Sequence, residues 1–219
     1  MPGKRPGGAG VTAPPLLSRG AAPGVHGEVE GDRALVEGLR RGEAGAFEAA
    51  YGRYRARVHA FLLRLARDAG VAEDLLQETW LRLARSATRL DGQTDLAAWL
   101  FTVARNLHVS HRRWRLLDVE RMRALRLWPR GGGTPTPFDH AEANETERRL
   151  EAALGRLPAA YREALLLVTA ERFEPHQAAA ILGLSADAAR QRIARARAML
   201  RKALGEEPGH VPAAEGGAT

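Results

Sequence analysis

The chain has 219 residues, enough for one large domain or two small ones, and its 33 Lys or Arg against 26 Asp or Glu give a net charge of +7. A basic balance favours an anionic partner, and nucleic acid is the most common such partner. The absence of cysteine excludes disulfides, thiolate metal sites and cysteine nucleophiles.

Residues 1–31 are rich in Gly, Pro and Ala and show no apolar periodicity, so we expect a disordered N-terminal tail. This stretch lacks the continuous apolar core of a secretory signal. No other segment approaches the roughly 18 apolar residues of a membrane-spanning helix. We therefore expect a cytoplasmic protein with no membrane insertion.

Residues 32–116 carry apolar residues at helical spacing and predict an all-helical domain. Within it, AEDLLQETW (residues 72–80) has two distinct faces when it is placed on a helix at about 100° per residue. The outer face is mostly polar and contains Asp74, Gln77, Glu78, Leu81 and Arg85. The opposite face is a core stripe of Ala72, Leu76, Thr79, Trp80 and Leu83. The polar face is either a solvated surface, the usual case, or a docking surface.

The segment RLDGQTD (89–95) interrupts the helical pattern and supplies the candidate helix-capping residues Thr94 and Asp95. The helix predicted after it has an apolar stripe, with Arg105, His108, Arg112 and Arg115 on the other side. His108 and His111 are three residues apart, but no nearby carboxylate completes a set of metal ligands. We therefore predict no metal site, and no motif in the sequence indicates a cofactor or a catalytic centre.

Residues 117–144 include three consecutive glycines and several prolines, and they predict a flexible linker. Helical periodicity resumes over 145–204, and residues 205–219 are predicted to form a disordered C-terminal tail. The sequence contains no convincing strand pattern. The predicted fold is therefore all-α, with two small helical domains joined by a flexible linker.

The segment 173–204 has the order of a helix-turn-helix motif. Pro175 suits the first turn of a short apolar helix, Gly183 suits the turn, and Ser185 suits the N-cap of the second helix. That helix carries a dense set of cations with no acid between 188 and 202, namely Arg190, Arg192, Arg195, Arg197, Arg201 and Lys202. Such a helix can bind the DNA major groove, although an ordinary helical hairpin with a solvated basic face is the alternative.

Three stretches together resemble the extracytoplasmic-function (ECF) sigma factors of the sigma-70 family, in the family's order and at fitting separations. They are AEDLLQETWLRL, AAWLFTVARNLHVSHRRWR and LPAAYREALLLVTAERFEPHQAAAILGLSADAARQRIARARAMLRKAL. The resemblance implies that 32–116 is a region 2-like domain and that 145–204 is a region 4-like domain. It implies an alternative sigma factor that directs promoter-specific initiation, assists DNA melting and has no enzymatic activity.

The resemblance also implies site residues. The polymerase-binding set is Asp74, Gln77, Glu78 and Leu81. The set for the −10 element is Arg105, Asn106, His108, Arg112, Arg113 and Arg115, and the loop 86–95 matches the family loop that captures a flipped base. The set for the −35 element is Ser185, Ala188, Arg190, Gln191, Arg192, Arg195 and Arg197.

The implied partners are promoter DNA, an anti-sigma factor and core RNA polymerase, through the clamp helices of its largest subunit and the flap of the second. One alternative is a stand-alone helix-turn-helix regulator, which explains 173–204 but not the polar face within 72–85. Another is a helical adaptor with no nucleic-acid role, which leaves both basic helices unexplained. The residues alone do not exclude either.

Overall fold

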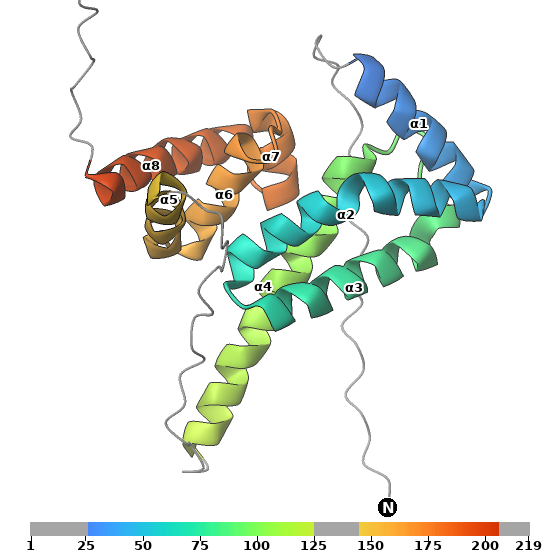
Figure 1. Cartoon of the computed structure of the whole chain (residues 1–219). Helices are drawn as coiled ribbons and strands as arrows, with labels where there is room; N and C mark the ends of the chain where they lie inside the picture. The colour runs from blue at the N-terminus through green and yellow to red at the C-terminus, as the bar shows by residue number, and fades with distance from the viewer. Residues whose placement is uncertain (1–25, 125–144, 206–219) are drawn as a thin grey trace, which may run out of the picture.

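The computed structural model describes residues 26–124 and 145–205, and these are helical throughout apart from short connections (Figure 1). The first group of helices is α1 (His26–Arg40), α2 (Ala44–Ala66), α3 (Ala69–Ser86), the short 3-10 helix η1 (Ala87–Arg89) and α4 (Leu96–Ala124). The second group is α5 (Glu145–Arg156), α6 (Ala159–Thr169), α7 (Pro175–Leu182) and α8 (Ala186–Leu204). The all-α prediction is confirmed. None of the described helices is long and apolar enough to cross a membrane.

Helices α2 and α3 lie side by side, and α4 crosses behind them (Figure 1). A tight connection joins α2 to α3, because Arg67 adopts a left-handed conformation and Asp68 caps the next helix by accepting a hydrogen bond from Val71 N at 3.0 Å. The predicted cap Asp95 starts α4, its Oδ1 accepting from Ala98 N at 2.9 Å.

The predicted core stripe of α3 is confirmed, since Ala72, Leu76, Thr79, Trp80 and Leu83 are all buried. The Trp80 ring packs edge-on against two aromatic residues of α2, with centroid distances of 6.0 Å to Phe47 and 4.8 Å to Tyr51. Aromatic pairs in this geometry add to the stabilisation from burial alone.

Two helix boundaries differ from the predicted domain boundaries. Helix α1 begins at His26, inside the predicted tail, and α4 continues to Ala124, inside the predicted linker. The extension of α4 has a simple reason: residues 117–124 contain no Gly or Pro, so nothing in them ends the helix. Residues 1–25, 125–144 and 206–219, which hold the rest of the predicted tails and linker, lie outside the described residues.

The predicted helix-turn-helix is present in the second group. Pro175 lies in the first turn of α7, and Glu174 and Gln177 form a reciprocal capping box there. Gly183 ends α7 with φ 65°. The Ser185 hydroxyl then caps α8 by accepting a hydrogen bond from Ala188 N at 3.2 Å. The local sequence signals therefore have the structural roles that were predicted for them.

The two groups pack against each other, which the sequence did not predict. Helix α4 contacts α7, and α2 contacts α6. Phe101 of α4 packs edge-on against Phe61 of α2 at 5.1 Å between centroids, and against Phe173, just before α7, at 5.2 Å. The buried apolar residues of both groups therefore form one continuous core.

Candidate docking and nucleic-acid surfaces

The outer face of α3 is exposed as predicted. Asp74 and Gln77 are open to solvent, and the Leu81 side chain lies among them with half of its surface exposed. Glu78 is only partly exposed because its Oε1 accepts a hydrogen bond from Arg82 Nε at 2.9 Å, one helical turn away. The four predicted polymerase-binding residues thus share one surface on which three polar groups surround an apolar side chain.

A groove of about 370 Å³ runs along this face, between α2 and α3. Its α3 side includes Leu76, Gln77 and Leu81, and its α2 side is formed by Phe47, Tyr51 and Arg55. In the sequence, Phe47 and Tyr51 are two of the apolar residues at helical spacing within 32–116. Their role in the groove depends on how α2 packs on α3, for which neither helix alone carries a signal.

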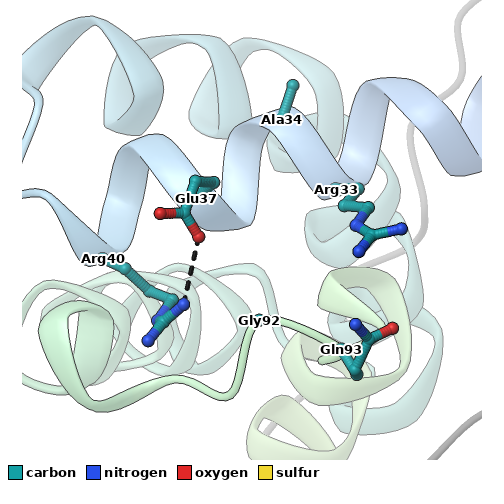
Figure 2. Close-up of a pocket in the computed structure, with 6 residues that line it drawn as sticks. All are labelled: Arg33, Ala34, Glu37, Arg40, Gly92 and Gln93. Atoms are coloured by element: carbon teal, nitrogen blue, oxygen red, sulfur yellow. Dashed lines mark hydrogen bonds and ion pairs between the residues drawn. The ribbon is translucent and has the colours of Figure 1, made fainter.

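A second pocket, of about 460 Å³, lies between α1 and the loop that follows η1 (Figure 2). Its lining residues are Arg33, Ala34, Glu37, Arg40, Gly92 and Gln93. In the loop, Asp91 Oδ1 accepts from Gln93 N at 2.8 Å, and in α1 Arg40 donates to Glu37 at 3.0 Å. The contribution of α1 to this pocket was not predicted. The guanidinium groups of Arg33 and Arg40 and the side-chain amide of Gln93 are hydrogen-bond donors suited to a nucleobase edge or a phosphate.

The predicted −10 set on α4 divides into two parts. Arg112, Arg113 and Arg115 are exposed, together with Trp114, whose side chain is 64% exposed. Arg105 and Asn106 are only partly exposed. The Arg105 guanidinium donates to Glu163 Oε2 of α6 at 3.2 Å and to Asn106 Oδ1 at 3.2 Å.

The prediction that His108 contacts DNA does not fit this structure, because only 2% of the residue is exposed. Neither ring nitrogen has a hydrogen-bond partner. Burial, together with the positive charges of Arg112 and other nearby cations, lowers the pKa of His108 to about 4. His108 is therefore a neutral, buried side chain. Across residues 26–124 and 145–205 there is no cluster of potential ligands that could hold a metal ion.

The predicted −35 set lies along α8. Arg190, Gln191, Arg195 and Arg197 are exposed, and Arg192 is partly exposed. Asp187 pairs with Arg190, so one of these cations is partly neutralised. The Ser185 hydroxyl is occupied as the helix cap, and Ala188 is partly buried. The arrangement is a cationic helix held on an apolar base of Ala189, Ile193 and Ala196.

Comparisons with known proteins identify the family. Residues 50–115 match the family model for sigma-70 region 2, and residues 147–200 match that for sigma-70 region 4. The RNA polymerase sigma factor CarQ of Myxococcus xanthus is 35% identical over 172 residues, which cover 78% of this chain and 96% of CarQ. The ECF RNA polymerase sigma factor EcfG of Rhodopseudomonas palustris is 37% identical over 150 residues, 67% of this chain and 78% of EcfG.

A solved structure is similar over both groups of helices. The sigma factor RpoE from Bartonella quintana, in complex with the anti-sigma factor NepR, matches with a TM-score of 0.63 and 27% identity. The match covers 74% of this chain and 98% of RpoE. Both matched regions occur in the order that the motifs predicted. The chain therefore belongs to the extracytoplasmic-function sigma factors of the sigma-70 family.

Proposed function

We propose that three surfaces of this chain make its contacts with core RNA polymerase and with promoter DNA. As a sigma factor, the chain binds core RNA polymerase and directs initiation at promoters by reading their −35 and −10 elements. The first surface is the outer face of α3, with Asp74, Gln77, Glu78 and Leu81, which docks on the clamp helices of the largest polymerase subunit. The observation that carries this assignment is the exposed Leu81 set among polar groups beside the α2–α3 groove. Polar contacts fix register, and burial of Leu81 adds affinity.

The second surface reads the −10 element. It combines the pocket between α1 and the loop after η1 with Arg112, Arg113 and Arg115 of α4. Unstacking a base costs a few kcal/mol, so a pocket that accepts the flipped base and arginines that hold the backbone favour melting together. Arg105 and Asn106 remain in the proposed set, and His108 is omitted because it is buried.

The third surface is α8, which binds the −35 element in the major groove through Arg190, Gln191, Arg192, Arg195 and Arg197. Ser185 and Ala188 shape the start of this helix. They stay in the proposed set because they lie at the N-terminal end of α8, the end that helix-turn-helix proteins direct at base edges. The region 4-like unit is also the proposed contact of the polymerase flap.

Sigma factors are not enzymes, and we propose that this chain carries out no covalent chemistry of its own. Its proposed location is the cytoplasm, since its proposed partners are core polymerase and promoter DNA. An anti-sigma factor is a further proposed partner, because the similar sigma factor RpoE was solved bound to one.

The test of the docking surface is the double variant Asp74→Ala with Gln77→Ala. Both side chains are exposed, so the helical content and thermal unfolding should be unchanged, while binding to core RNA polymerase in pull-down or fluorescence assays should be lost. Glu145→Ala, at an exposed position on α5, is the matched control and should bind as the native chain does.

Normal polymerase binding by the double variant would refute the docking surface. If the native chain bound a specific duplex tightly with no polymerase present, and did not bind core polymerase, the stand-alone regulator would be the better account. Both assays need a stated salt concentration, because basic proteins bind polyanions nonspecifically at low salt.

A further inference from the structure

The pocket in Figure 2 has one wall whose charged groups are already bonded within the protein. Arg40 Nη1 donates to Glu37 Oε2 at 3.0 Å, and Arg41 Nη1 donates to Glu37 Oε1 at 3.5 Å. Arg40 also lies close to the backbone of the loop, because a Cβ on Gly92 would come within 3.1 Å of its Nη1. The Glu37–Arg40 pair is therefore a fixed wall of the pocket, and the one carboxylate of the lining has both oxygens occupied.

Arg33 has donors that remain open to a ligand. Asp32, the acid next to it in α1, pairs with Arg53 at 2.7 Å, and no acid among the described residues pairs with Arg33 itself. Arg33 and Gln93 lie at one end of the pocket, with the fixed wall at the other (Figure 2). A ligand in this pocket therefore meets an unpaired guanidinium and a side-chain amide at the same end.

An unpaired guanidinium distinguishes nucleobases by their acceptors. Its planar fork of donors binds most strongly when two acceptors lie side by side. Guanine offers O6 and N7 in this way. Cytosine offers O2 and N3 on its pairing edge, which is open once the base is flipped out of the duplex. In adenine and thymine every acceptor stands next to a donor or a carbon, so neither base can fill the fork.

Gln93 favours a different base, because an amide bonds well to the N6 and N7 edge of adenine. The two preferences are unequal in strength. A hydrogen bond from a charged donor is about twice as strong as one between neutral groups, so Arg33 outweighs Gln93. The carboxylate that could accept from an adenine amino group is that of Glu37, and the fixed wall already occupies it.

We propose that Arg33 sets the base specificity of this pocket, and that the pocket selects guanine or cytosine over adenine or thymine. The inference rests on the proposed function, in which the pocket accepts a flipped base of the −10 element. Helix α1, which supplies Arg33, lies before the residues 50–115 that match sigma-70 region 2. The residue that reads the base is therefore outside the segment that identifies the domain.

The test uses holoenzyme assembled from core RNA polymerase and the full chain. It selects from promoter duplexes that are randomised across the −10 element, and the bound DNA is sequenced. The native chain should show one position at which guanine or cytosine is preferred roughly tenfold over adenine and thymine. Arg33→Ala should lose the preference at that position and keep those at the other positions, whereas Gln93→Ala should retain it.

Arg33→Lys separates base reading from simple attraction of the DNA. Lysine keeps the positive charge but cannot form two parallel hydrogen bonds. This variant should therefore bind promoter DNA about as tightly as the native chain, yet select bases no better than Arg33→Ala. Arg149→Ala, which removes an exposed cation on α5 far from the pocket in the chain, is the control and should keep the native preference.

Modified bases test the acceptor pair directly. If the selected base is guanine, 7-deazaguanine lacks the N7 acceptor and should lose most of the roughly tenfold advantage. If the selected base is cytosine, 2-pyrimidinone keeps O2 and N3 but lacks the amino group, and it should bind as well as cytosine. Neither replacement should change the affinity of Arg33→Ala for the promoter.

Selection of adenine or thymine by the native chain, or guanine and cytosine retained by Arg33→Ala, would overturn the inference. So would a loss of affinity that is equal for all bases and restored by Arg33→Lys, since Arg33 would then bind a phosphate. A failure of the proposed function looks different. In that case the chain would form no holoenzyme, or an abasic site at the selected position would bind as tightly as the complete promoter.

Discussion

At the scale of single residues, the burial of His108 should make the free energy of unfolding depend on pH. Its pKa in the folded chain is lowered to about 4, while an unfolded histidine titrates near 6.5. Between these values the unfolded state binds more protons. The free energy of unfolding should therefore be highest above about pH 6.5 and fall as the pH drops towards 4, by about 2–3 kcal/mol at most. Urea unfolding at a series of pH values measures this slope.

The variant His108→Leu isolates the effect, because it keeps an apolar side chain of similar size in the same site. Its unfolding free energy should change less over the same pH range. His59→Leu, at a partly exposed position on α2, is the control and should keep the native slope. Equal slopes in the native chain and in His108→Leu would contradict a neutral, buried His108.

His108 also indicates a limit of sequence-based prediction. On an isolated helix it lies on the same side as Arg105 and Arg112, so the pattern grouped all three as DNA contacts. What separates them is tertiary packing, which buries His108 and pairs Arg105 with Glu163 of α6. Glu163 lies 58 positions from Arg105 in the chain, beyond the range of any helical periodicity.

At the scale of elements, the turn of the helix-turn-helix depends on Gly183. Its φ of 65° is in the left-handed region, where a side chain costs about 1–2 kcal/mol. A Cβ there would meet no atom within 4 Å, so the cost is one of backbone conformation alone. Gly183→Ala should lower the free energy of unfolding by about 1 kcal/mol, and Gly183→Asn by less, as thermal or urea unfolding can measure.

Gly52→Ala is the matched control within the same chain. Gly52 lies in the middle of α2 with normal helical geometry, and a Cβ there also meets nothing within 4 Å. Alanine should therefore stabilise this helix, by up to about 1 kcal/mol. Equal effects at the two positions would mean that the turn does not require a left-handed residue.

Elements with local signals were predicted well from the sequence. Pro175, Gly183 and Ser185 have their predicted positions in the helix-turn-helix, and Asp95 caps α4. The groove beside α3 and the α1 side of the other pocket were not predicted, because each forms between two elements and the sequence of one element carries no signal for the packing of the other. The groove beside α3 needs Tyr51 from α2, and the pocket in Figure 2 needs α1 beside the loop after η1.

At the scale of the whole molecule, the question is whether the two groups unfold together. They share one apolar core, and Arg162 bonds to carbonyls of both, so we expect the native chain to unfold in one cooperative transition. Arg162→Leu removes every donor to five backbone carbonyls, which belong to the ends of α2 and α5 and to the α5–α6 turn, and should destabilise the chain by several kcal/mol. Arg162→Lys should not restore stability, because an ammonium cannot reproduce the planar fork of donors.

The form of the transition distinguishes coupling from simple loss of stability. Without the Arg162 bonds that join α2 to the α5–α6 turn, the region 2-like and region 4-like units should unfold separately, giving two transitions in calorimetry. Arg156→Leu, at an exposed position on α5, should keep a single transition and native stability. If Arg162→Leu instead unfolded in one transition at a lower temperature, the remaining contacts between the groups, among them Phe101 with Phe173 and Arg105 with Glu163, would be sufficient to couple the units. Arg162 would then stabilise the α5–α6 turn rather than the contact between the two groups.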